Sequence, residues 1–164
     1  MVFEGDPYNL LSAVLPVSVS GDSVNEEVVV KDRQIAVMMP FEHDATIDPV
    51  YRAIQEGSKK AGFDCIRVDQ LMEPTDITDD IRKLIIESRA VIADLSGKNL
   101  NVMYEIGFAH GCNKKVVLIS SDPLDGLPFD IRSQRVYGYS KNGTGLNDLT
   151  DRISSVLESM AEDN

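Results

Sequence analysis

The sequence predicts an α/β fold in which helices cover both faces of a five-stranded parallel sheet. From about residue 33 onward, short apolar segments of strand length alternate five times with segments of helical periodicity. Such alternation is typical of βα units that build a parallel sheet. The apolar run Val117–Ile119 is continuous rather than alternating, as expected for a strand that is buried on both faces.

The first two strands flank a helix with clear boundary residues. We expect the first strand over Gln34–Met39. Asp48 is a preferred capping residue and Pro49 fits a first helical turn, so a helix is expected to begin there. Gly62 is expected to end this helix, and Phe63–Val68 then forms the second strand.

The second helix is expected to open with Asp76 as its cap. Its apolar side carries Ile77, Ile81, Leu84, Ile85 and Ser88, and its polar side carries Asp79, Asp80, Arg82, Lys83 and Glu87. This spacing is that of an amphipathic helix. Ala90–Asp94 is the third expected strand, and Asn99–Asn113 is the third expected helix.

The last part of the chain predicts two more strands and a long helix. Lys115–Ser120 is the fourth strand, a loop rich in proline and glycine follows, and Arg135–Tyr139 is the fifth strand. The final helix carries apolar residues at helical spacing, namely Leu146, Leu149, Ile153, Val156, Leu157 and Met160. Right-handed crossovers favour a doubly wound, flavodoxin-like sheet with the order 2-1-3-4-5. Ligands then bind in the crevice at the carboxyl ends of strands one and three.

Composition limits the classes of partner. Residues 1–32 show no clear period and are interpreted as an N-terminal arm or linker, so the domain covers residues 33–164. The net charge is −11 and no dense basic cluster is present, which disfavours polymeric nucleic acid as a partner. No apolar run approaches the roughly 20 residues that span a bilayer, so no membrane partner is expected. The two cysteines and two histidines lack metal-ligand spacing, so we expect no metal site. We also expect no cofactor. Isolated free cysteines indicate a cytoplasmic protein.

Glu105 is the most informative single residue. It is the only carboxylate between Asn99 and Asn113, and its neighbours are apolar around nearly the whole helix. A lone buried carboxylate is unfavourable unless it is paired, hydrogen-bonded or used in chemistry. The free N–H groups of the first helical turns favour its ionised form, which suits a nucleophile. A structural pair with a nearby arginine is an equally weighted alternative.

Asp94 ends the third strand and is expected to point into the crevice, where it can pair with Glu105. Two carboxylates roughly 5 Å apart are the arrangement of retaining glycosyl transfer. Alternatively, Asp94 is a turn residue that binds the backbone of the segment after the strand. Gly107 and Gly111 share the helix with Glu105, and glycine inside a helix predicts a close approach by a strand backbone or a ligand.

Two loops supply further candidates. Met39, Pro40 and Phe41 follow the first strand, and their loop can close over a base or sugar or can form an ordinary proline turn. Asp69, after the second strand, is a candidate for holding ribose hydroxyls, and a plain surface acid is equally compatible. The chain has no G-x-G-x-x-G motif after the first strand and no G-x-x-x-x-G-K-[ST] motif, which disfavours the usual dinucleotide and P-loop sites.

The segment VIADLSGKNLNVMYEIGFAH at residues 91–110, followed by KVVLI at 115–119, resembles the nucleoside 2-deoxyribosyltransferase superfamily. That superfamily includes nucleotide N-glycosidases and borders on bacterial TIR-like domains. AVMMPF at residues 36–41 and PFDIR at 128–132 extend the resemblance, which covers roughly Arg33 to the C-terminus. It implies that Glu105 attacks the anomeric carbon and releases the base, that Asp94 assists, and that the protein is a homo-oligomer.

We therefore expect an enzyme that cleaves or transfers the N-glycosidic bond of a nucleoside or nucleotide. Glu105 is the expected nucleophile and Asp94 the expected helper. The expected substrate-binding residues are Met39, Pro40, Phe41, Asp69, Ser96, Gly97, Asn99 and Asn101. Two alternatives remain open: a non-catalytic nucleotide-binding or sensing domain, and an NAD-cleaving TIR-like effector.

Overall fold

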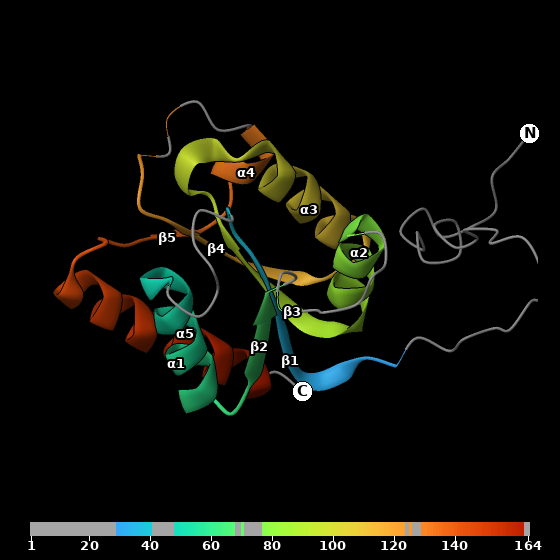
Figure 1. Cartoon of the computed structure of the whole chain (residues 1–164), viewed down its shortest axis with the longest axis horizontal. Coiled ribbons are helices and arrows are strands. Elements are labelled where there is room, and N and C mark those ends of the chain that lie inside the picture. The colour runs from blue at the N-terminus through green and yellow to red at the C-terminus, as the bar shows by residue number, and fades with distance from the viewer. Residues whose placement is uncertain are drawn as a thin grey trace, which may run out of the picture.

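A computed structural model of the chain confirms the expected α/β architecture (Figure 1). The structure describes residues 29–40, 48–67, 70, 77–123, 125 and 129–162. Five parallel strands form one sheet with the order β2-β1-β3-β4-β5. This is the flavodoxin-like order that the alternation of segments predicted.

The elements lie close to their expected positions. The strands are β1 (Lys31–Met38), β2 (Asp64–Arg67), β3 (Ser88–Asp94), β4 (Lys115–Ser120) and β5 (Val136–Gly138). The helices are α1 (Pro49–Lys60), α2 (Ile77–Glu87), the short 3-10 helix η3 (Ser96–Lys98), α3 (Leu100–Gly111), α4 (Phe129–Arg132) and α5 (Gly143–Glu162). Helix α4 lies where only a loop was expected, because a single helical turn is too short to show periodicity.

Helices α1 and α5 cover one face of the sheet, and α2 and α3 cover the other (Figure 1). Successive side chains along a strand point to opposite faces. In β3, Ala90 and Ile92 therefore pack with α1 and α5, whereas Val91 and Ala93 pack with α2 and α3. This alternation decides on which side of the sheet the Asp94 carboxylate lies, whereas Glu105 lies on the side that α3 covers.

Glycines have different roles in the two helical layers. A Cβ atom on Gly57 of α1 would lie 2.5 Å from the carbonyl oxygen of Thr150 in α5, so this helix crossing requires glycine. Gly107 and Gly111 of α3 have no described heavy atom within 4 Å of such a Cβ position. The close approach of a strand backbone expected at these two glycines is wrong within the described chain, because they lie on the exposed side of α3. The approach of a ligand stays a prediction.

Cys65 and Cys112 are free thiols, and both are partly buried. Over the residues that the structure describes, no helix has the length and apolar character needed to cross a membrane. Within the same residues, no three side chains of the His, Cys, Asp or Glu type gather in a way that can hold a metal ion.

Candidate functional site

A pocket of about 410 Å³ lies between α2, α3 and the end of β1. It is next to the point where the strand order reverses between β1 and β3, which is where this fold predicts a ligand site. A mostly apolar lining with a few polar groups is usual for a small-molecule site. The described lining residues are Met39, Pro40, Ile77, Thr78, Ile81, Arg82, Ile85, Asn99, Asn101, Val102, Tyr104, Glu105 and Phe108.

Glu105 is the one carboxylate in the described lining of this pocket. The residue is only 7% exposed. Burial alone raises the pKa of its carboxyl group to about 7, and no hydrogen bond or nearby charge in the described chain opposes this shift. Glu105 is therefore a desolvated acid that titrates near neutral pH.

This environment differs from the one that the sequence predicted for Glu105. The residue lies in the second turn of α3, which begins at Leu100, and the effect of a helix terminus fades within the first turn. The side chain of the capping residue Asn99 also accepts hydrogen bonds from the backbone N–H groups of Asn101 and Val102, at 2.9 and 3.3 Å. No arginine of the described chain pairs with Glu105 either, so the alternative of a structural ion pair is not seen there.

The structure brings only part of the expected site to this pocket. The expected residues that line it together with Glu105 are Met39, Pro40, Asn99 and Asn101. Phe41 and Asp69 lie outside the described residues. Asp94, Ser96 and Gly97 do not line the pocket.

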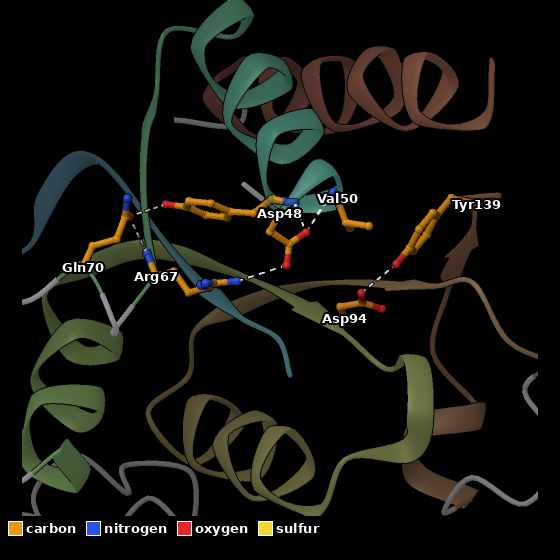
Figure 2. A network of polar contacts seen from close by, with 7 residues as sticks. Asp48, Val50, Arg67, Gln70, Asp94 and Tyr139 are labelled. Carbon is orange, nitrogen blue, oxygen red and sulfur yellow. Dashed lines mark hydrogen bonds and ion pairs between the residues drawn. The ribbon is translucent and has the colours of Figure 1, made fainter. Parts of the chain in front are cut away.

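Asp94 points to the opposite side of the sheet from Glu105. It is the last residue of β3 and has the same facing as Ala90, toward α1 and α5. Its Oδ1 accepts hydrogen bonds from the backbone N and the Oγ of Ser96, at 3.0 and 2.5 Å. Its Oδ2 accepts a hydrogen bond from the hydroxyl of Tyr139 at 2.7 Å (Figure 2). Asp94 therefore does not line the pocket with Glu105, and it has the turn role that was its alternative.

Ser96 and Gly97 connect the loop after β3 to the loop after β4. The backbone N of Ser121 donates to the Oγ of Ser96 at 2.9 Å, and the backbone N of Gly97 donates to Oδ2 of Asp122 at 2.7 Å. Gly97 has a φ of +70°, which glycine adopts without strain. Burial raises the pKa of Asp94 in this cluster, and the hydrogen bonds to its carboxylate partly oppose that shift.

A buried ion pair at the start of α1 was missed by the sequence analysis. The side chain of Arg67 is fully buried, and its Nη1 lies 3.2 Å from Oδ2 of Asp48 (Figure 2). The other carboxylate oxygen of Asp48 accepts hydrogen bonds from the backbone N of Val50 and Tyr51, at 2.9 and 3.1 Å. The predicted cap is thus confirmed. The arginine at the end of a predicted strand was the available signal that this cap also binds a cation.

Arg82 lies on the polar side of α2, as its helical spacing predicted, and its contact with α3 was missed. Its side chain is 40% exposed, yet it lines the pocket. The reason is that its Nη2 reaches across to α3 and donates to the hydroxyl of Tyr104 at 3.2 Å. Helical periodicity assigns a side chain to a face of its own helix, and it does not show which neighbouring helix lies within reach.

No protein-family model matches the chain, and no curated protein sequence matches it. Among solved structures, it is similar to a diflavin flavoprotein A3 from Nostoc sp., with a TM-score of 0.52 and 14% identity over 81% of this chain and 96% of that one. It is also similar to a TIR-STING receptor from C. gigas in complex with 2',3'-cGAMP, with a TM-score of 0.53 and 20% identity over 77% of this chain. The match spans 41% of that receptor. These similarities show the fold, which flavodoxin-like and TIR-like domains share.

Proposed function

We propose that the pocket around Glu105 binds a nucleoside or nucleotide and that Glu105 cleaves or transfers its N-glycosidic bond. One observation carries this proposal: Glu105 is only 7% exposed, and its carboxylate lines the pocket with no hydrogen-bond partner in the described chain. Such a group is unfavourable for folding, so a functional use explains its presence. Its pKa of about 7 is in the range to which enzymes tune catalytic carboxyl groups.

In the proposed reaction, an oxygen of the ionised Glu105 forms a bond to the anomeric carbon while the bond between that carbon and the base nitrogen breaks. The electron pair of the broken bond goes to the base, which takes up a proton from water. Water or a second base then attacks the same carbon, the ester to Glu105 breaks, and the carboxylate is restored. In hydrolysis, the attacking water releases its proton to solvent.

The other expected residues have different parts in this proposal. Asn99 and Asn101 line the pocket on the same helix end as Glu105, and their side-chain amides suit sugar hydroxyls. Met39 and Pro40 offer an apolar wall for the base. We assign Asp94 to holding the loop after β3 rather than to proton transfer, because its carboxylate is engaged by Ser96 and Tyr139 away from the pocket.

The test of this mechanism is a Glu105→Gln variant, with release of free base measured chromatographically for a panel of nucleosides and nucleotides. We expect turnover to fall by at least about a thousandfold, because the amide cannot act as the nucleophile. Glu56→Gln makes the same change at an exposed position of α1 and serves as the matched control. Unchanged turnover in the Glu105 variant would sink the proposal.

The pH dependence of turnover provides a separate check. Only the ionised form of Glu105 can attack carbon, and its pKa is about 7. We therefore expect kcat/KM for base release to rise with pH and to level off above about pH 8. A profile that falls as pH rises through neutrality would indicate that the protonated form is needed and would exclude the nucleophile role.

The similarity in fold to a TIR-STING receptor favours one second candidate, which is cleavage of NAD. The bond between nicotinamide and ribose is also N-glycosidic, so the same attack by Glu105 applies. Incubation with NAD, followed for release of nicotinamide, tests this candidate. Tight nucleotide binding without any base release over hours would instead favour a non-catalytic sensing domain.

The resemblance further leads us to propose a homo-oligomer. Light scattering over a range of protein concentrations tests this. The mass of a single chain at every concentration would contradict it.

A further inference from the structure

We infer that Arg82 and Tyr104 make the Glu105 pocket selective for a phosphate-bearing ligand, so that its substrate class is a nucleotide rather than a nucleoside. This inference rests on the function proposed for Glu105 and specifies the ligand of the same site. It is supported by the distribution of charge in the pocket, by the hydrogen-bond donors at Arg82, and by the weakness of the ion pair that competes for them.

The described lining of the pocket contains one cation and one carboxylate. Arg82 comes from α2 and Glu105 from α3, and the other described lining residues carry no charge at neutral pH. The chain has 27 acidic and 16 basic residues, so a basic pocket residue runs against its average charge. A nucleotide matches this lining, because one sugar carries both the anomeric carbon for Glu105 and a phosphate for Arg82.

Arg82 and Tyr104 together present donors to an anion. The Nη2 of Arg82 donates to the Tyr104 hydroxyl at 3.2 Å, and its Nη1 lies 3.3 Å from Oδ1 of Asp79. These two contacts leave further N–H groups of the guanidinium for a ligand. The Tyr104 hydroxyl accepts from Arg82, so its own hydrogen can point to a phosphate oxygen. Arginine binds phosphate through paired donors of this kind.

The main alternative is that Arg82 only forms a surface ion pair with Asp79. The two residues are three positions apart on α2, and their side chains are 40% and 74% exposed. Water solvates both charges, so a pair of this kind contributes little. A phosphate carries more negative charge than a carboxylate at neutral pH. It can therefore displace Asp79 as the main acceptor for Arg82.

The test uses ligand pairs that differ only in one phosphate: adenosine with adenosine monophosphate, and nicotinamide riboside with nicotinamide mononucleotide. Calorimetry on Glu105→Gln protein measures binding without cleavage, and base release is measured with Glu105 present. Arg82→Gln and Tyr104→Phe remove the proposed donors, and Asp79→Asn removes the competing carboxylate. Lys83→Gln is the matched control, because Lys83 is a cation of the same helix that is 73% exposed and does not line the pocket.

We expect the phosphate-bearing member of at least one pair to bind about tenfold more tightly, because a charge-assisted contact is gained. Arg82→Gln should remove most of this preference for phosphate, and Tyr104→Phe should remove part of it. Asp79→Asn should increase the preference, and the control Lys83→Gln should leave the preference unchanged. A preference confined to the nicotinamide pair identifies an NAD-type ligand, and one confined to the adenosine pair identifies an adenine nucleotide.

Three results would overturn the inference: equal binding within both pairs, a phosphate preference that survives Arg82→Gln, and no binding of any of the four ligands. These results are separable from a failure of the proposed reaction. Base release that depends on Glu105 but ignores phosphate removes the inference and keeps the reaction. Phosphate-selective binding that depends on Arg82, without any base release, removes the reaction and supports the phosphate site.

Discussion

The two sides of the sheet differ in how they treat buried carboxylates. On the side of α1 and α5, Asp48 caps the helix and pairs with Arg67, and Asp94 accepts hydrogen bonds from two side chains. On the side of α2 and α3, Glu105 is buried in a pocket wall without a partner in the described chain. The difference teaches that burial alone does not distinguish a structural acid from a candidate catalytic one. The partners of the carboxylate do.

The largest effect is expected from removing a paired acid. Asp48→Ala would leave the guanidinium of Arg67 buried without this carboxylate, and α1 would lose its cap. We expect the free energy of unfolding, measured with urea, to fall by about 3–5 kcal/mol. Asp151→Ala breaks an exposed ion pair in which Oδ1 of Asp151 lies 2.9 Å from Nζ of Lys60. This change should lower the free energy of unfolding by less than about 1 kcal/mol. Similar losses in the two variants would contradict the structural role of the buried pair.

Glu105 should show the opposite behaviour, and the effect depends on pH. Its pKa is raised from 4.5 to about 7 in the folded protein. Between pH 4.5 and about 7, Glu105 keeps its proton in the folded protein and loses it in the unfolded chain. A rise in pH through this range therefore favours the unfolded state and lowers the free energy of unfolding. Glu105→Gln lacks this titration. We compare the free energy of unfolding of the Glu105→Gln variant with that of the unmodified protein. We expect this difference to shift in favour of the variant by at most roughly 3 kcal/mol between acidic and neutral pH.

Urea unfolding of both proteins at several pH values measures this difference. The comparison with the variant matters because the other carboxyl groups titrate equally in the two proteins and cancel. A difference that stays constant from acidic to neutral pH would show that Glu105 does not titrate with a raised pKa.

The smallest effect contrasts two glycines, one in each helical layer. Gly57→Ala forces a Cβ against the carbonyl oxygen of Thr150 and should destabilise the protein by about 1–3 kcal/mol. Gly107→Ala meets open space and should stabilise α3 by up to about 1 kcal/mol. Thermal unfolding of the two variants measures whether each change lowers or raises the stability of the protein. Equal destabilisation by both would indicate that the exposed side of α3 is covered in solution.

The strand order was predictable from the sequence because each apolar segment carries its own local pattern. The directions in which the site's side chains point were harder to predict from the sequence. Asp94 and Glu105 follow one another closely in the chain, so sequence reasoning placed them together. The alternation of β3 and the hydroxyl of Tyr139, which comes 45 residues after Asp94, turn this carboxylate the other way. Contacts over such a separation leave no trace in local periodicity.

Contacts between neighbouring helices were equally hidden. Arg82 follows the polar pattern of α2, and only the position of Tyr104 on α3 brings its guanidinium into the pocket lining. By contrast, Glu105 was identifiable because its oddity is local: a single acid in an otherwise apolar helical segment. The parts of the site that depend on one helix were therefore predicted, and the parts that depend on two were not.

The unpartnered state of Glu105 has a consequence for laboratory evolution of this protein. Natural proteins lose stability where an active group is kept in an unfavourable environment, and selection for stability alone tends to discard such groups. A library of random variants selected only for resistance to heat, without any assay of activity, should therefore accumulate neutral replacements of Glu105. Replacements of Asp48 or Asp94, which are bonded to their neighbours, should be depleted from the same library.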